Sequence, residues 1–188
     1  YDRATALFAE ALSLFDELGF PIFRSSVLLY WGIAACHHRD YDRARMLVEE
    51  SLPSLRKADD KLAVARALHV LGLVARHQGD NWKSTALFRE SLTLSQELGA
   101  RLEVAQCLEG LAGVASTQSS AEKAVRLFAS AIALRQVIGT PLLPGDHADY
   151  DRDIGSLHTR LNEATFNFAW SAGLAMTMEQ AIALAFEE

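Results

Sequence analysis

Residues 36–40 read Cys-His-His-Arg-Asp, so a thiol, two imidazoles and a carboxylate lie within five positions. These groups are typical zinc ligands and also build catalytic clusters. A zinc site, however, needs spacings such as Cys-x-x-Cys or His-x-x-x-His, and neither occurs here. Because the chain repeats, this stretch is equivalent to residues 76–80 and 116–120, which do not keep the cysteine or the paired histidines. We therefore predict a turn between two helices, with Asp40 capping the second helix and no metal bound.

A second candidate is the acidic run of residues 149–155, in which Asp149, Asp151 and Asp153 alternate with other residues. This spacing resembles the start of a calcium-binding loop, which also needs glycine at its sixth position and glutamate at its twelfth. The chain has Ile154 and Arg160 at those positions. We therefore favour a solvated helix start, where carboxylates interact well with the helix dipole.

The remaining reactive side chains are scattered. His69, His77, His147 and His158 have no metal-binding spacing. Neither a G-x-S-x-G nucleophile motif nor a G-x-x-x-x-G-K-[ST] phosphate loop is present. The sequence therefore predicts a protein that is not an enzyme, with no catalytic residue, metal or cofactor.

Composition narrows the class of partner and the compartment. The formal net charge is -6 and no block of Lys and Arg occurs, which argues against direct binding to nucleic acid. The only two cysteines, Cys36 and Cys107, do not form a disulfide framework, so we expect a reducing, cytoplasmic environment. The longest apolar run, residues 27–36, is about half of a membrane span. The chain begins in helical rhythm without a signal peptide, and no membrane association is predicted.

The elements that would position any site follow a repeat of 40 residues. Four related segments occupy residues 1–19, 41–59, 81–99 and 121–139, and three others occupy 22–40, 62–80 and 102–120. Apolar residues within them recur at i, i+3, i+4 and i+7, which predicts amphipathic helices. Each repeat is therefore a pair of helices, and stacked pairs share a continuous core.

Local signals mark the ends of these helices. Gly19, Gly99 and Gly139 stand where a helix ends in a left-handed residue. Asp40 and Asp80 stand where an N-cap side chain accepts hydrogen bonds from backbone N–H groups. Pro53 falls inside a predicted helix and predicts a kink near residues 49–53.

Equivalent positions also keep similar sizes. Small residues recur in three sets, and one position is bulky in every copy. The sets are Gly32, Gly72 and Ala112; Ala44, Ser84 and Ala124; Ser51, Ser91 and Ala131; and the bulky Phe8, Val48, Phe88 and Phe128. We expect the small residues to lie where helices cross closely and the bulky ones to fill the core between them.

This order of residues resembles the tetratricopeptide repeat. The best copy reads Leu68, Leu71, Gly72, Ser84, Phe88 and Ser91. The period departs from the 34 residues usual for the family, and no proline ends the second helices. The spacing looks like a long-helix variant found in large bacterial signalling proteins. The resemblance implies an all-α, right-handed α-α solenoid over residues 1–139, with the first helix of the first pair missing.

The repeat stops after Gly139. Residues 140–146 read as a linker, and helical patterns follow over 147–162, 163–173 and 178–188, the last with Thr177 as N-cap. We predict that residues 140–188 fold back as a helical cap on the array, because a terminal repeat exposes a core face. The apolar residues expected to cover it are Phe166, Phe168, Trp170, Ile182, Leu184 and Phe186.

In tetratricopeptide arrays the first helix of each pair lines a concave groove that binds ligands. Carried over by position, the groove residues are Ser26, Leu29, Ile33 and Cys36; Arg66, His69, Leu73 and Arg76; and Gln106, Glu109, Gly113 and Ser116. Arg66, His69 and Arg76 share one helix face, and the two guanidinium groups could hold a carboxylate or phosphate. Alternatively, these side chains are merely solvated or pair with Glu109.

The tail also resembles segments that follow repeat arrays in bacterial regulators with LuxR-type DNA-binding and NTPase domains, or with nucleotide cyclases. The resemblance implies a protein-interaction or sensor module of a signalling or transcriptional regulator, which binds a peptide, a protein or a small effector. The alternative is a structural adaptor that self-associates and has no dedicated small ligand.

Overall fold

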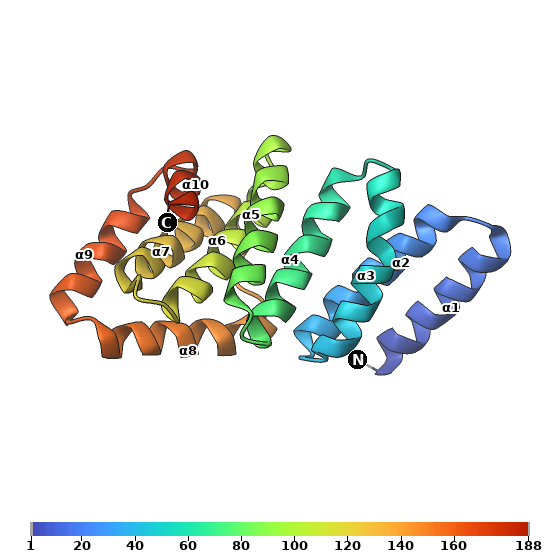
Figure 1. Cartoon of the computed structure of the whole chain (residues 1–188), viewed down its shortest axis with the longest axis horizontal. Helices are drawn as coiled ribbons and strands as arrows, with labels where there is room; N and C mark the ends of the chain where they lie inside the picture. Colours follow the sequence, from blue (N-terminus) through green and yellow to red (C-terminus); the bar gives the residue numbers. More distant parts are fainter. Residues whose placement is uncertain (1, 188) are drawn as a thin grey trace. The chain divides into compact units, whose positions relative to one another are not determined.

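The computed structural model describes residues 2–187, apart from the side chain of Pro144. Tyr1, the first residue of the predicted segment 1–139, and Glu188, the last residue of the predicted segment 140–188, lie outside the described residues. Throughout the described range every regular element is an α-helix (Figure 1), and the predicted all-α fold class is confirmed. No helix in this part of the chain is long and apolar enough to cross a membrane.

The helices follow one another at short, regular intervals. They are α1 (Asp2–Leu18), α2 (Pro21–His37), α3 (Tyr41–Lys57), α4 (Lys61–His77), α5 (Asn81–Glu97), α6 (Arg101–Ser116), α7 (Ala121–Ile138), α8 (Pro144–Arg160), α9 (Glu163–Leu174) and α10 (Met178–Phe186). From α2 to α7 each helix therefore begins twenty residues after the one before it. The chain divides into two compact units, residues 1–87 and 88–188, with the boundary inside α5.

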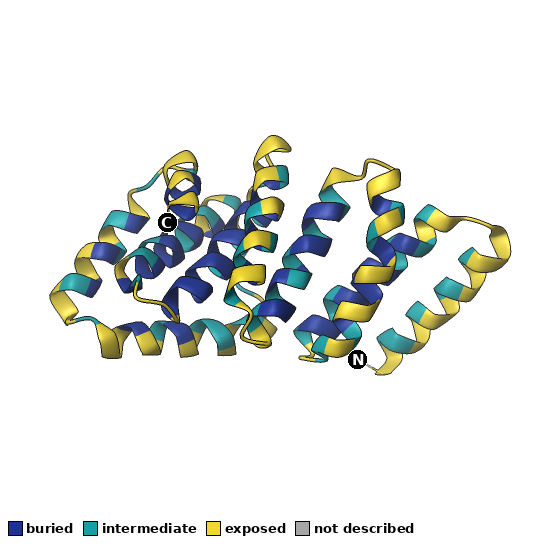
Figure 2. Cartoon of the chain, viewed as in Figure 1, coloured by how far each residue is buried: buried dark blue, intermediate teal, exposed yellow. Residues whose placement is uncertain are grey.

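In the first unit, α2 packs against α1, α3 and α4. Leu28, Trp31 and Leu47 form a buried cluster, against which Phe8 of α1 packs. A Cβ atom on Gly32 would lie 2.5 Å from Val48 Cγ2, so only glycine lets α2 and α3 approach this closely. Figure 2 shows that α1 is the most exposed helix of this unit, and none of its described residues is buried.

In the second unit, α7 packs against α6 and α9 and also contacts α8 and α10. Phe88 and Phe128 are almost completely buried, as is Val48 in the first unit. A Cβ atom on Gly110 would lie 2.5 Å from the Phe88 ring, and one on Gly173 would lie 2.4 Å from the carbonyl oxygen of Arg126. Gly110 thus leaves room for the Phe88 ring beside α6, and Gly173 lets α9 approach the backbone of α7.

The apolar tail residues are only partly buried. Phe166, Ile182 and Leu184 are buried, whereas Trp170 is half-buried and Phe186 is exposed. The expectation that Phe168 covers the core is wrong, because its side chain is 71% exposed. In a helix, residues two positions apart point in nearly opposite directions, so Phe166 and Phe168 cannot both face the core.

The predicted caps are confirmed. The Asp40 carboxylate accepts a hydrogen bond from the N–H of Arg43 at 3.2 Å, and Asp80 accepts one from Lys83 at 3.0 Å. Thr177 and Gln180 form a reciprocal capping box at the start of α10. Pro53 lies inside α3, which runs from Tyr41 to Lys57; the kink stays a prediction.

The predicted left-handed residues are also confirmed, since Gly19, Gly99 and Gly139 have positive φ angles. Gly79, Arg39 and Asp59 adopt the same conformation, with φ angles of 79°, 61° and 54°. A left-handed residue therefore ends a helix at intervals of twenty residues from position 19 to position 99.

Candidate functional site

The Cys-His-His-Arg-Asp stretch forms the end of α2 and the turn before α3. The N–H of Arg39 donates to the carbonyl of Cys36 at 2.9 Å, and that of Asp40 donates to the carbonyl of Ala35 at 2.9 Å. Cys36 is only 9% exposed. Among the described residues, no group of three or more His, Cys, Asp or Glu side chains could hold a metal ion.

His77, at the equivalent position of the next turn, is a packing residue. Its ring stacks on the ring of Tyr41, with 3.9 Å between centroids and 24° between planes. Tyr41 begins α3 and His77 ends α4, so the stack joins the ends of two helices.

The second cysteine is deeply buried. Its Sγ atom lies 3.1 Å from the hydroxyl oxygen of Ser91, to which the thiol of Cys107 donates. Burial raises the pKa of Cys107 to about 12, and the nearby Glu103 and Glu109 act in the same direction against the Ser91 hydrogen bond. The neutral thiol is a poor nucleophile, so Cys107 fits a core position.

The acidic run lies within α8 and does not start it, since α8 begins at Pro144. Arg152 forms ion pairs with Asp149 at 2.6 Å and with Asp153 at 3.3 Å. Asp153 is only 5% exposed, so the description of this run as a solvated helix start is wrong for Asp153. Because successive carboxylates point in different directions around a helix, one of them faces the core while others face solvent.

The candidate binding residues of α2 differ in access. Ser26 and Ile33 are half-buried, whereas Leu29 is 1% exposed and Cys36 is also buried. The Ser26 hydroxyl donates to the carbonyl of Ile22 at 3.1 Å. Of the four candidates on α2, only Ser26 and Ile33 are therefore accessible enough to contact a ligand.

The candidates on α4 are Arg66, His69, Leu73 and Arg76, and all four are half-buried. Arg66 Nη1 donates to the hydroxyl of Tyr30 in α2 at 3.2 Å. Tyr30 is half exposed and was not among the sequence-predicted residues. The groove positions carried over from the tetratricopeptide repeat do not include Tyr30. The only signal in the sequence is its residue type, since Tyr30 places a phenol in an otherwise apolar helix segment.

The candidates on α6 lie in the second unit. Gln106 and Glu109 are half-buried, whereas Gly113 and Ser116 are buried. Glu109 accepts two hydrogen bonds from Arg135 of α7, at 2.5 Å and 2.9 Å. The guanidinium of Arg160, in α8, donates to the carbonyl oxygens of Ser116 and Gln118.

Charged and phenolic groups from α6, α7 and α8 meet around Glu109. Burial raises the pKa of Glu109, an effect that Arg135 opposes and Asp146 adds to. Burial also raises the pKa of Tyr150, and the charge of Glu109 adds to this effect. The Tyr150 ring contacts the Phe128 ring edge-on, with 5.4 Å between centroids. This cluster joins α8 to the α6–α7 pair.

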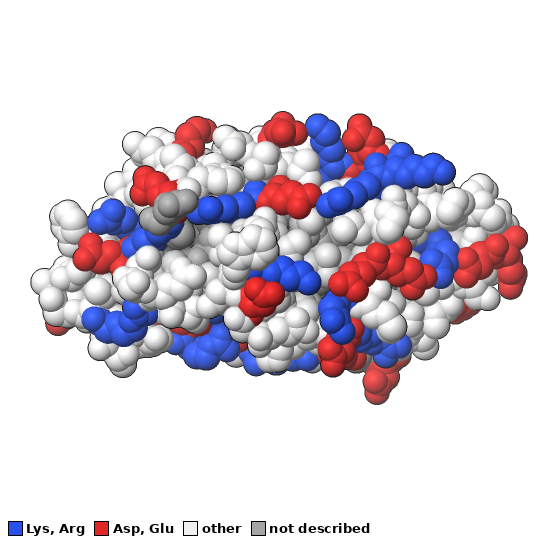
Figure 3. Space-filling model, viewed as in Figure 1, with Lys and Arg blue, Asp and Glu red and all other residues white. Residues whose placement is uncertain are grey.

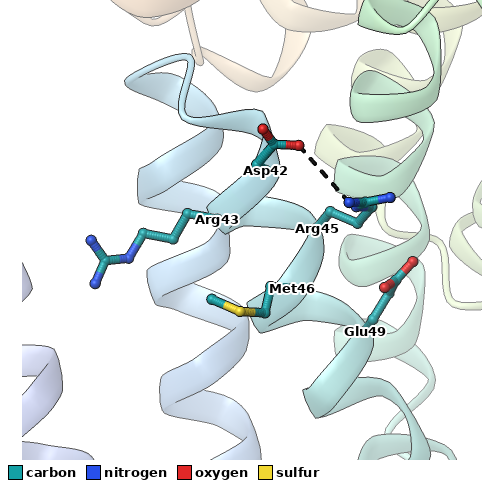
Figure 4. Close-up of a pocket in the computed structure, with 5 residues that line it drawn as sticks. All are labelled: Asp42, Arg43, Arg45, Met46 and Glu49. Atoms are coloured by element: carbon teal, nitrogen blue, oxygen red, sulfur yellow. Dashed lines mark ion pairs between the residues drawn. The ribbon is translucent and has the colours of Figure 1, made fainter.

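A shallow hollow lies on α3 and is lined by Asp42, Arg43, Arg45, Met46 and Glu49 (Figure 4). Arg45 pairs with Asp42 at 3.9 Å, while Arg43 points to the other side and lies 4.6 Å from the centre of the Trp31 ring. All five residues come from one helix, and Met46 is 60% exposed. The hollow is a feature of an exposed helix surface and brings no reactive groups together. On the face drawn in Figure 3, cationic and anionic side chains are interspersed.

Comparison with curated proteins gave no match, and comparison with solved structures gave none. A family model does match the part of the chain that contains the pairs α2–α3 and α4–α5. Proteins of this repeat type generally present paired helices to protein partners. Residues 23–97 match the family model of the tetratricopeptide repeat.

Proposed function

We propose that the chain is a protein-interaction module that binds a peptide or protein segment on one face of α2 and α4. This α2–α4 face consists of Ser26, Tyr30 and Ile33 of α2 with Arg66, His69, Leu73 and Arg76 of α4. The observation that supports the proposal is the family match over residues 23–97, because such repeats generally mediate protein–protein interaction.

The chemistry of the α4 residues suggests what the segment contains. Arg66, Leu73 and Arg76 are spaced by seven and three positions, which places them on one side of a helix. Arg66 and Arg76 are about 15 Å apart along the helix axis at a rise of about 1.5 Å per residue. An extended peptide covers this distance in about five residues. Two carboxylates at that separation, with an apolar residue between them, would match the face.

The resemblance of the tail to segments of bacterial regulators supports a more specific role. In that role the module senses a partner or a small effector and transmits binding to an attached domain of a signalling or transcriptional regulator. Such transmission requires a ligand that prefers one of two conformations.

Selection from a displayed peptide library, followed by titration of the selected peptides, tests the binding proposal. We expect peptides with two separated acidic residues, and we expect Arg66→Ala/Arg76→Ala to weaken their binding at least about tenfold, as for the loss of charge-assisted hydrogen bonds. Arg45→Ala is the matched control, because it removes a half-exposed arginine from α3. If the peptides bind Arg66→Ala/Arg76→Ala as tightly as the unaltered chain but bind Arg45→Ala more weakly, the binding site is not the α2–α4 face.

A second candidate function is self-association, and one observation favours it. Leu7, Leu14 and Leu18 lie at helical spacing on α1 and are 57%, 50% and 61% exposed. Exposed apolar stripes of this kind often mark protein interfaces. Light scattering over a range of concentrations tests this: a mass that rises with concentration, and falls to the monomer with Leu14→Glu, supports an adaptor that oligomerises. A constant monomer mass rules it out.

A further inference from the structure

Helix α8 differs from the other helices of the second unit in how it packs. Figure 1 shows α8 running crosswise to α6 and α7, and it contacts both of them. Its inner side carries Tyr150, Asp153 and Leu157, spaced as neighbours on one helix face. Leu157 is completely buried and Tyr150 packs on Phe128. The helix therefore places an amphipathic face on the α6–α7 pair.

The surface that α8 contacts includes two positions that the tetratricopeptide resemblance assigns to ligand binding. Glu109 and Ser116 belong to the predicted binding positions of α6, and both interact with α8. Asp146 lies near enough to Glu109 to influence its pKa, and Arg160 donates to the carbonyl of Ser116. Because Arg160 also donates to the carbonyl of Gln118, it places a cation at the C-terminal end of α6, where the helix dipole favours it.

The helix lacks two common sources of local stability, a capping side chain and a helix-favouring residue at position 155. Its N-cap residue, Leu143, makes no side-chain capping hydrogen bond. Gly155 lies in its interior, and nothing lies within 4 Å of where a Cβ atom would be, so the glycine serves no packing purpose. Helices α9 and α10, by contrast, begin with capping side chains from Asn162 and Thr177. Among the described side chains of α8, only Asp153 and Leu157 are buried.

The segments on either side of α8 bear on whether it can separate from α6 and α7 while α9 stays in place. Gly139 ends α7 in a left-handed conformation, and Leu142 and Leu143 precede α8 in a non-helical segment. Beyond α8, α9 packs closely on α7 through Gly173, and it contacts α8 through the stack of Phe166 on His158. Local opening that breaks the His158–Phe166 stack and the hydrogen bonds of Arg160 would expose the α6–α7 surface, while Gly173 keeps α9 packed on α7.

We propose that the α6–α7 surface is a helix-binding site that α8 occupies in cis, and that an amphipathic helix of a partner protein displaces it. The partner helix would carry the pattern of α8: an aromatic residue, a leucine seven positions later and an arginine three positions after that, with a carboxylate one turn before the aromatic residue. This site uses α6 and α7, so the proposal does not depend on binding at the α2–α4 face. Tethering gives α8 a high effective concentration, so the partner binds weakly until α8 opens.

Hydrogen exchange on the complete chain tests the opening. We expect the backbone amides of residues 147–160 to exchange at least about a hundredfold faster than those of α7 and α9, because local opening costs less than global unfolding. If α8 exchanges at the same rate as α7, it is an integral part of the core and the proposal is overturned.

Binding in trans tests the site. The probe is a fluorescent peptide of residues 144–161, titrated against the complete chain by anisotropy. Leu157→Asp in the chain should weaken the contact of α8 and tighten peptide binding at least about tenfold, whereas Gly155→Ala should strengthen α8 and weaken peptide binding about fivefold. A peptide carrying Leu157→Asp should not bind. The Arg66→Ala/Arg76→Ala chain should bind the probe as the unaltered chain does, which separates this site from the α2–α4 face.

Amide exchange in the Leu157→Asp chain shows how its peptide binding is to be interpreted. If the Leu157→Asp chain keeps slow exchange in α7 and α9 but does not bind the peptide, the surface is not a helix-binding site. If exchange becomes fast throughout residues 101–186, α8 is required for the fold, and the proposal is also overturned.

Discussion

Arg135 of α7 donates two hydrogen bonds to the carboxylate of Glu109 in α6, with Nε–Oε1 at 2.5 Å and Nη2–Oε2 at 2.9 Å. Arg135 is only 4% exposed. Its Nη1 atom also donates to the carbonyl oxygen of Thr140 at 3.2 Å. One guanidinium group therefore joins α6, α7 and the segment that leads to α8.

Breaking this pair should destabilise the second unit strongly. Arg135→Met leaves the Glu109 carboxylate buried without its partner, and we expect a loss of about 3–5 kcal/mol in the free energy of unfolding. The double variant Arg135→Met/Glu109→Leu should recover most of that loss, since apolar residues can replace a buried pair. Urea denaturation measures both. Equal losses in the single and double variants would contradict this account.

The same carboxylate should make stability depend on pH. Burial raises the pKa of Glu109 above its ordinary value of 4.5, so the folded state retains the proton at pH values where the unfolded chain releases it. The contribution of Glu109 is therefore full below pH 4.5 and declines as the pH rises through the folded-state pKa. The difference in unfolding free energy between the unaltered chain and Glu109→Gln should fall from pH 4 to pH 7. A difference that rises over this range would contradict the direction of the shift.

Features set by neighbouring residues could be predicted from the sequence. A capping carboxylate such as Asp40 needs only the N–H three residues later, and Gly139 needs only its own φ freedom. The periodic apolar pattern likewise specifies which face of a helix is buried, because that face is local to the helix. These signals were enough to predict the helix pairs and the buried positions of Val48 and Phe88.

Features that depend on distant partners could not be predicted. Arg135 and Glu109 are 26 positions apart, and nothing in the periodicity says that their side chains meet. Arg160 and Ser116 are 44 positions apart, so the contact of α8 with α6 appears only in the folded chain. Tyr30 was missed for the same reason, since its hydroxyl matters only where Arg66 reaches it.

Two glycines within helices should respond oppositely to alanine. At Gly173 the new Cβ would lie 2.4 Å from the Arg126 carbonyl oxygen, which is backbone and cannot move aside easily. We expect Gly173→Ala to cost about 1–3 kcal/mol, as for other overpacked sites. Gly155→Ala, where the Cβ meets open space, should instead stabilise by up to about 1 kcal/mol. Thermal melting of both variants checks the pair, and equal shifts would contradict the close approach of α9 to α7.

Two residues with left-handed backbone conformation, Gly79 and Asp59, should also respond oppositely to substitution. Gly79 has a φ angle of 79°, and Gly79→Ala should cost about 1–2 kcal/mol because a Cβ is strained in that region. Asp59 already bears that strain at a φ angle of 54°, so Asp59→Gly should raise the melting temperature. A lower melting temperature for Asp59→Gly would show that its carboxylate contributes more than the backbone strain removes.

The end of α10 depends on Arg89 of α5. Its Nε and Nη2 atoms lie 3.3 Å and 3.2 Å from the carbonyl oxygen of Ala185, and Nη2 also lies 2.9 Å from that of Glu187. Because these carbonyls end a helix, they lack intrahelical partners, and a cation there is favourable. Arg89→Leu should destabilise α10 by about 1–2 kcal/mol, and Arg89→Lys should recover part of it.

Lys123 reports on the same contact. Burial lowers the pKa of its ammonium group below 10.5, and the charge of Arg89 lowers it further. Removing that charge in Arg89→Leu should therefore raise the Lys123 pKa, whereas Arg89→Lys should leave it low. Titration of the side-chain resonances by NMR measures the pKa. Local fraying of α10 would also hydrate Lys123 and raise its pKa, so amide exchange in residues 181–186 separates the two causes. Fast exchange in Arg89→Leu would assign the rise in the Lys123 pKa to lost burial, and unchanged exchange would assign it to the lost charge of Arg89.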